Sequence, residues 1–184
     1  MNYFNLIHRY IPPDTPTYPI YITHCHMVAK LSLEIAQRLQ LSKGSQKFIE
    51  EAAMLHDIGI IETDTPTLYC SGTLHYLCHG VEGRAILEAE GYPNHGLVAE
   101  RHIGVGLRIE DIINQDLPLP HRDMTAQSVE EEIITYADLF YSKNVNRLWQ
   151  SKSLEKVRKS VARYGEGQLA ILEEWVQRFE SENH

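Results

Sequence analysis

The residues of this sequence best suited to chemistry are histidines and aspartates that recur on apolar helix faces. The chain contains 10 histidines in 184 residues. Imidazole and carboxylate groups together bind divalent transition metals such as Fe, Mn, Co, Ni and Zn, whereas soft-metal sites use thiolates. The three cysteines form no Cys-x-x-Cys pair, so the sequence indicates neither a thiolate zinc site nor a disulfide framework. The pattern therefore points to a metal centre built from imidazoles and carboxylates.

Helical spacing decides which of these side chains face inward. His24 extends the apolar spacing of Val28 and Ile35, whereas His26 lies about 200° away around the same helix. We therefore expect His24, and not His26, to be a ligand. Inward-facing positions on four further helical segments are occupied by His56 with the adjacent Asp57, His79, His102 and Asp138. Burying such groups without partners costs several kcal/mol each, and one shared metal centre would satisfy all of them.

Each of these residues, taken alone, also has an ordinary structural explanation. An inward histidine is commonly a hydrogen-bonded core side chain, and Asp138 could be a solvated helix residue. A His-Asp dipeptide arises by chance about 0.4 times in a chain of this composition. Cys25 is interpreted as a small buried side chain, and His95 and His121 as loop or surface residues. The shared phase of six residues on five helices is what favours the metal site.

Seven helical segments are predicted to position these residues, at about 23–40, 45–58, 79–90, 93–102, 128–141, 154–164 and 169–179. Thr23 is the expected N-cap of the first segment. Residues 1–22 are expected to form a short helix or turn and then an extended arm, and residues 60–78 and 103–127 to form loops. Gly83 would let another backbone or a substrate approach closely. No convincing strand is visible, so the predicted fold class is all-α, a compact bundle of about seven helices in one domain, 1–184.

Overall charge narrows the partners that this chain is expected to have. The formal net charge is −8, which argues against a nucleic-acid-binding protein, because such proteins bind phosphates through basic surface. No apolar run approaches the ~18 residues of a membrane span. The first residues lack the pattern of a secretory signal. We therefore expect a cytoplasmic enzyme or binding domain with no membrane and no nucleic-acid partner.

Three segments, in order, resemble the motifs of the HD-domain superfamily, which are helical metal-dependent phosphohydrolases. The segment Thr-His24-Cys-His-Met-Val-Ala is similar to the first histidine motif of the family, usually His-Ser-x-x-Val-Ala. Leu-His56-Asp57-Ile-Gly59 resembles the signature in its His-Asp-Ile-Gly variant, and Ala-Asp138 resembles the terminal metal aspartate. The resemblance covers about residues 20–145. Residues 146–184 would then be C-terminal helices that either cap this core or build a homodimer surface through apolar faces such as Trp175 and Phe179.

The resemblance implies a ligand set. In the family, a set matching His24, His56, Asp57 and Asp138 binds one metal ion, and members with two further histidines usually bind two. By this resemblance, the first metal would be bound by His24, His56 and Asp138 and the second by His79 and His102. Asp57 would bridge the two metals. The expected cofactor is therefore one or two divalent ions of Fe, Mn, Ni, Co or Zn, with iron placed first.

Two departures from the family pattern matter. Many members carry a lysine directly after the glycine of His-Asp-Ile-Gly, where it contacts substrate phosphate, but this chain has Ile60. The HD-GYP branch has adjacent histidines near the position of His102 and a later Gly-Tyr-Pro segment. Here a single His102 is present and Gly91-Tyr92-Pro93 precedes it, so the tripeptide is interpreted as a helix break.

The implied function is a metal-dependent phosphohydrolase that cleaves a phosphate ester or anhydride, of a nucleotide, by metal-activated hydroxide. Asp57 is the expected catalytic carboxylate, and His75 in the 60–78 loop is a candidate general acid. Arg101 and Lys143 are the expected substrate-binding residues at the phosphate. Two alternatives stay open: a diiron oxygenase that uses the same ligands on a small substrate, and a non-catalytic regulatory domain that retains the metal site.

Overall fold

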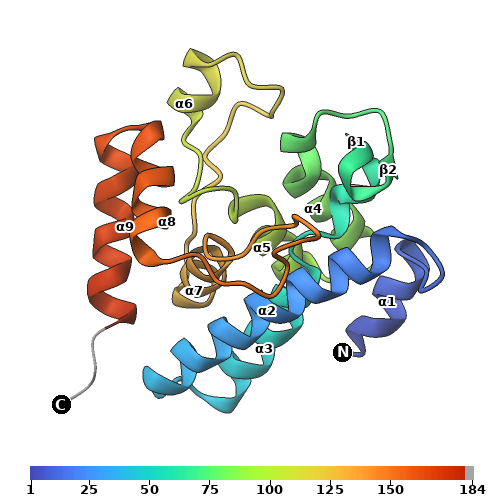
Figure 1. The fold of residues 1–184 in the computed structure, drawn as a ribbon, viewed down its shortest axis with the longest axis horizontal. Coiled ribbons are helices and arrows are strands. Elements are labelled where there is room, and N and C mark those ends of the chain that lie inside the picture. Colours follow the sequence, from blue (N-terminus) through green and yellow to red (C-terminus); the bar gives the residue numbers. More distant parts are fainter. Residues whose placement is uncertain (181–184) are drawn as a thin grey trace.

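The computed structural model describes residues 1–180, and this part of the chain is predominantly helical (Figure 1). The first elements are α1 (Tyr3–Tyr10), α2 (Thr17–Arg38), α3 (Lys43–Leu55), η1 (Ile58–Glu62), β1 (Asp64–Thr65), η2 (Pro66–Leu68), β2 (Cys70–Ser71) and η3 (Tyr76–Cys78). The chain continues with α4 (His79–Ala89), α5 (Pro93–Arg101), α6 (Ile109–Asn114), α7 (Val129–Asp138), α8 (Leu154–Val161), η4 (Ala162–Tyr164) and α9 (Glu166–Phe179). The predicted all-α class is confirmed.

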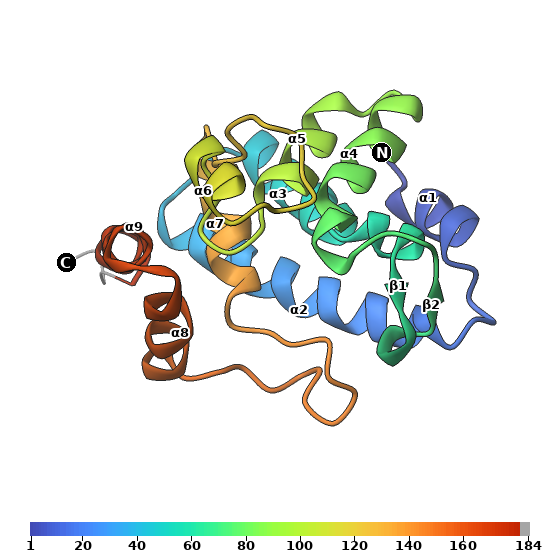
Figure 2. The same ribbon diagram turned by 90° about the horizontal axis from the view of Figure 1, so that it is seen from above.

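Helix α2 lies across the middle of the molecule, between the red α8 and α9 on one side and the β1–β2 pair on the other (Figure 2). It packs against α3 and α7. Val28 and Ile35 are fully buried, as their helical spacing predicts, while His26 is exposed. The hydroxyl of Tyr21 donates a 2.8 Å hydrogen bond to the carbonyl oxygen of Met54. This contact joins α2 to the end of α3, where the His-Asp pair follows.

Glycines bring the backbone after α3 against the start of α4. A Cβ atom on Gly59 would lie 2.1 Å from the carbonyl oxygen of His79 and 2.3 Å from the nitrogen of Gly83. A Cβ atom on Gly80 would likewise lie 2.7 Å from the carbonyl oxygen of Ala99 on α5. Of the two options that the sequence left open at Gly83, the structure shows the first: another backbone, that of Gly59, approaches it.

The N-terminal arm is helical where an extended segment was expected. Helix α2 begins at Thr17, so Thr23 lies inside it and the prediction that Thr23 is an N-cap is wrong. Pro19 falls in the first turn of α2, where backbone N–H groups have no partner within the helix and a missing one is tolerated. The prolines therefore mark the start of a helix and not an arm.

Two segments expected to be loops contain short regular structure. Residues 109–114 form α6, whose Ile112 is fully buried, but six residues are too few to give a periodic signal. Residues 64–71 contain an antiparallel pair in which Asp64 lies opposite Ser71 and Thr65 lies opposite Cys70. Because each strand has only two residues, alternation could not reveal it.

Helices α8 and α9 form a layer at the C-terminal end of the described chain (Figure 2). Trp175 and Phe179 are buried, and the ring centroid of Phe179 lies 5.4 Å from that of Tyr136 on α7. These two side chains therefore cover the core and do not present the exposed apolar face expected for a dimer. Within residues 1–180, no helix combines the length and apolar character needed to cross a bilayer.

Candidate metal centre

Segments distant in the sequence converge on one oxygen of Asp57. His24 lies inside α2, His56 and Asp57 directly follow α3, and Asp138 ends α7. The Nε2 atom of His24 lies 3.1 Å from Asp57 Oδ2 and 3.0 Å from Asp138 Oδ1. The Nε2 atom of His56 lies 3.2 Å and 3.6 Å from the same two oxygens. We call this group the first half of the cluster: His24, His56 and Asp138 with Asp57 Oδ2.

A second set of imidazoles faces the other oxygen of Asp57. The Nε2 atoms of His79 and His102 lie 3.3 Å and 3.6 Å from Asp57 Oδ1, and 3.1 Å from each other. We call His79, His102 and Asp57 Oδ1 the second half of the cluster. All of these side chains are buried except Asp138, whose side chain is 19% exposed. Asp57 is therefore the only residue shared by both halves.

Three of the four histidines are oriented by the helix ends at which they stand. His56, His79 and His102 follow α3, η3 and α5 as C-cap residues. Their Nδ1 atoms donate 2.6–2.7 Å hydrogen bonds to the backbone oxygens three residues earlier, those of Ala53, Tyr76 and Ala99. Such carbonyls at a helix end lack partners within the helix. Each bond fixes the ring and directs Nε2 toward Asp57, as outer hydrogen bonds do for metal-binding histidines.

The donor atoms of the cluster fit a metal ion. A neutral imidazole that donates from Nδ1 has only a lone pair at Nε2, so no hydrogen lies between His79 and His102 unless one ring gains a second proton. Within residues 1–180, no hydrogen bond reaches the buried Nε2 atoms of His24 and His56 or Oδ1 of Asp57. Ligands at about 2.1 Å from one ion lie about 3.4 Å apart in tetrahedral geometry. The spacings in both halves match that value, and a cation would satisfy the orphaned atoms.

The amine of Lys143 provides the nearest positive charge. Its Nζ atom lies 2.6 Å from Asp57 Oδ2 and 5.8 Å from the ring centroid of Tyr76. Burial alone would raise the pKa of Asp57, but Lys143 and His56 hold it well below its usual range. Burial would lower the pKa of Lys143, but Asp57 holds it well above its usual range. The buried carboxylate and ammonium are therefore both charged.

The protonation of the cluster differs from residue to residue. Burial would raise the pKa of Asp138, yet the imidazoles of His24 and His56 beside its Oδ1 and the charge of Lys143 keep that pKa well below its usual range. Burial lowers the pKa of His102 to about 4, which leaves this imidazole neutral as a metal ligand must be. Burial would lower the pKa of His56 too, but the charge of Asp57 raises it well above its usual range.

Cys25 lies next to the cluster as a thiol. Its sulfur falls within 4.8 Å of donor atoms of His56 and Asp57. Burial raises the pKa of the Cys25 thiol, which disfavours the thiolate that metals bind. This agrees with the interpretation of Cys25 as a small buried side chain.

Two residues assigned to substrate by the sequence have other contacts. Arg101 donates from Nη1 to both carboxylate oxygens of Glu131, at 3.1 Å, so its charge is paired. His75 is exposed, and its Nδ1 accepts a 3.2 Å hydrogen bond from the backbone N–H of Leu77 at the start of η3. Their roles in binding or proton transfer stay predictions.

Tyr76 contributes to the cluster and was not anticipated. Its ring stacks on the ring of His79 with centroids 4.6 Å apart, and its backbone oxygen accepts the hydrogen bond from Nδ1 of His79. The sequence carries one signal for this contact, the three-residue spacing that Tyr76 and His79 share with Ala53 and His56. The signal becomes visible only once the helix ends are known.

Comparisons with known proteins agree with this geometry. A family model described as HD domain matches residues 21–142, more than half of the chain, so the chain belongs to the HD domain family. The resemblance stated from the three motifs is thereby confirmed. Membership and the His/Asp clusters together support a metal-dependent hydrolase in general terms.

Two proteins match this chain in sequence, and the matches span different shares of their lengths. The chain is 33% identical over 130 residues to the uncharacterized protein MJ0778 of Methanocaldococcus jannaschii, covering 67% of this chain and 69% of that protein. It is 26% identical over 148 residues to a tRNA (cytidine(56)-2'-O)-methyltransferase of Picrophilus torridus, covering 75% of this chain. The match spans only 38% of the methyltransferase.

Crystal structures of the HD domain of the L. monocytogenes phosphodiesterase PgpH share the fold. The TM-scores are 0.51 for PgpH alone and 0.52 for its complex with cyclic-di-AMP, each at 16% sequence identity. The alignments cover 94% and 95% of this chain and 94% and 92% of the PgpH chains. At this identity the likeness establishes the arrangement of helices, and cyclic-di-AMP is a ligand of PgpH.

Proposed function

We propose that this protein is a dinuclear metal-dependent phosphohydrolase that acts on a nucleotide. The observation that carries the proposal is the position of Asp57, whose two carboxylate oxygens face two separate sets of ligands. His24, His56 and Asp138 would hold one ion with Oδ2, and His79 and His102 would hold the other with Oδ1. The donor set of imidazoles and carboxylates suits Fe, Mn, Ni, Co or Zn, and we place iron first.

Divalent ions held by these residues would supply a hydroxide nucleophile near neutral pH and would offset the negative charge of the phosphoryl oxygens. The residues of this chain would hold and orient the reactants. The hydrogen bonds from Nδ1 to carbonyl groups keep the imidazoles fixed, so the site needs little rearrangement during reaction. Burial of the ligands excludes bulk water and strengthens electrostatic interactions inside the site.

Lys143 is the proposed contact for a substrate phosphate. Many relatives in the family carry a lysine directly after the signature glycine, but here Ile60 occupies that position and is fully buried. Lys143 brings an ammonium group to Asp57 from the loop that follows α7. In the proposal, this ammonium would donate a hydrogen bond to a phosphate oxygen of the substrate.

Existing contacts limit how His75 could act as a general acid and how Arg101 could bind phosphate. Because His75 Nδ1 caps η3, only the exposed Nε2 remains to carry a proton to a leaving oxygen. Arg101 would have to exchange Glu131 for a phosphate oxygen. We expect His75→Gln and Arg101→Met each to lower turnover. Unchanged turnover would contradict the role of His75 as general acid or of Arg101 as phosphate contact, respectively.

The test combines metal analysis with a phosphatase screen. The purified full chain, loaded in turn with Fe, Mn, Ni, Co or Zn, is assayed for phosphate release from nucleotides and phenyl phosphate. We expect two ions per chain, and a roughly tenfold to hundredfold loss of kcat/KM in Lys143→Met, with Lys30→Met on the exposed face of α2 as the matched control. Dioxygen consumption without phosphate release would instead support the oxygenase, and metal binding without turnover would support a regulatory domain.

A further inference from the structure

A cleft of about 630 Å³ leads to the cluster. It is lined by Thr65, Thr67, Leu68, Tyr76 and the loop residues Ser142, Lys143, Asn144, Val145 and Asn146. Two of these residues touch the cluster: Tyr76 stacks on His79, and Lys143 pairs with Asp57. The cleft is of the size that small-molecule sites have, and Tyr76 and Lys143 connect its lining to the cluster.

The lining of the cleft is nearly uncharged and exposes more apolar than polar surface. It offers hydroxyl groups and amides from Thr65, Thr67, Ser142, Asn144 and Asn146, and it contains one cation and no carboxylate. The Oδ1 atom of Asn144 accepts a 3.0 Å hydrogen bond from the backbone N–H of Asn146, which orients the exposed amide. Such groups hydrogen-bond neutral hydroxyl, carbonyl and amine groups of a ligand.

Other arginines near the ligands are paired with carboxylates. Glu100, which is buried, accepts hydrogen bonds from both Arg84 and Arg122. Arg101 is held by Glu131. These guanidinium groups would have to leave a carboxylate before they could bind a second phosphate.

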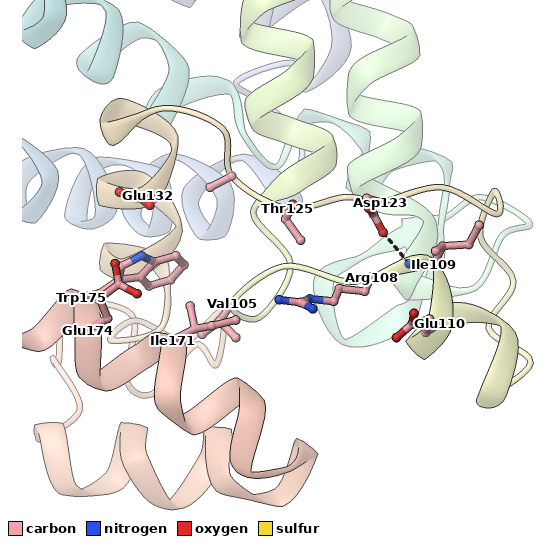
Figure 3. A pocket seen from close by; sticks show the side chains of 11 residues that line it. Val105, Arg108, Ile109, Glu110, Asp123, Thr125, Glu132, Ile171, Glu174 and Trp175 are labelled. Atoms are coloured by element: carbon pink, nitrogen blue, oxygen red, sulfur yellow. Dashed lines mark hydrogen bonds between the residues drawn. The ribbon is translucent and has the colours of Figure 1, made fainter.

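A second cavity has a negatively charged lining. It measures about 420 Å³ and lies between α9 and the loops around residues 105–109 and 123–126 (Figure 3). The side chain of Arg108 extends into it, but four carboxylates also line it, those of Glu110, Asp123, Glu132 and Glu174. This surplus of negative charge repels phosphate groups, so the cavity is no extension of the substrate site.

Resting on the proposed function, we infer that the cleft selects a phosphomonoester of a neutral polar group, a nucleoside monophosphate, over nucleoside triphosphates and cyclic dinucleotides. One phosphate reaches Lys143 and the metal centre, and the neutral nucleoside meets the hydroxyl and amide groups. Water adds to phosphorus, the bond from phosphorus to the ester oxygen breaks, and that oxygen takes a proton, giving phosphate and the free nucleoside. A second phosphate would lie among groups that cannot neutralise it.

The first experiment compares substrates on the metal-loaded full chain. We expect kcat/KM for a nucleoside 5'-monophosphate to exceed that for the triphosphate and the cyclic dinucleotide by roughly tenfold or more. Asn144→Ala should raise KM for the monophosphate roughly threefold to tenfold and should raise KM for phenyl phosphate by a smaller factor. Asn114→Ala, an exposed position of α6, is the matched control.

A binding measurement separates this inference from the proposed function. Calorimetry with a non-hydrolysable nucleoside 5'-phosphonate should show weaker binding to Asn144→Ala than to the wild type or Asn114→Ala. If no ester is hydrolysed but this pattern appears, the proposed function fails and the selectivity of the cleft stands. If phenyl phosphate is hydrolysed but the triphosphate or cyclic dinucleotide is used at least as well as the monophosphate, the inference is overturned. Loss of that activity in Arg147→Ala would then identify this exposed cation of the same loop as the second phosphate contact.

Discussion

The two halves of the cluster are built on different principles. In the first half, His24 stands inside the long helix α2, and Asp138 adds a second carboxylate to Asp57. In the second half, both histidines stand at helix ends around α4 and α5, and Asp57 supplies the only carboxylate. His79 and His102 are both fixed by carbonyl groups, whereas no hydrogen bond reaches the Nδ1 of His24.

The two halves therefore differ in the negative charge of their carboxylates and in how firmly their imidazole rings are oriented. The first half has more negative charge to attract a cation, and the second half has better-oriented rings. We therefore expect the first half to bind its ion more tightly.

Removing the shared carboxylate should disable both halves. In Asp57→Asn the neutral amide cannot bridge two cations, so we expect loss of bound metal and a fall in turnover of about 10³-fold. Metal content per chain and phosphate release measure the two effects. Asp14→Asn, at an exposed loop position, should match the wild type. Full metal content in Asp57→Asn would show that the halves do not depend on this bridge.

Single histidine variants should separate the halves. In His79→Ala we expect the metal content to fall from two ions to one, because the first half keeps its ligands. In His24→Ala the remaining ion should be the more weakly held, with an affinity roughly tenfold to hundredfold lower than that of the ion left in His79→Ala. Titration of metal-free protein gives both numbers. Equal affinities in the two variants would contradict the proposed ranking.

Gly59 should couple the halves through the backbone. A methyl group in Gly59→Ala would collide with the His79 carbonyl oxygen and the Gly83 nitrogen, which cannot move as a flexible side chain could. We expect the free energy of unfolding to fall by about 1–3 kcal/mol and the second half to lose metal before the first. Denaturant unfolding and metal analysis test this. Gly167→Ala in α9, which meets no atom within 4 Å, should be neutral or slightly stabilising.

His95 on α5 offers a comparison with a partly buried histidine outside both halves. Burial lowers its pKa, although Glu51 lies 3.5 Å away and opposes the shift. Because the unfolded chain binds this proton more readily, stability should be fully present above the ordinary histidine pKa and decline as the pH falls through it. Unfolding measured against pH in the wild type and in His95→Gln should show a smaller decline in the variant. Identical profiles would contradict this assignment.

Much of the fold follows from helical spacing in the sequence. The stripe around Val28 and Ile35 predicts which face of α2 is buried. Ser128, where the 128–141 segment is predicted to begin, is the N-cap of α7, and its side chain accepts a hydrogen bond from the N–H of Glu131. The start of α2 and the short helix α6 were missed, because first-turn prolines and six-residue helices resemble loops. Tyr76 was missed for a related reason, since it precedes its helix and follows no period.

Residue spacing along the chain is enough to decide which side chains can be drawn into one site. The phases of His24 and His102 on their helices follow from spacing alone, because a helix repeats every ~3.6 residues. It could not determine that Asp57 directs one oxygen to each half, that Lys143 reaches Asp57 from the loop after α7, or that Arg101 is occupied by Glu131. These depend on how helices approach one another, which is set by contacts such as Gly59 against α4 between residues far apart in the chain.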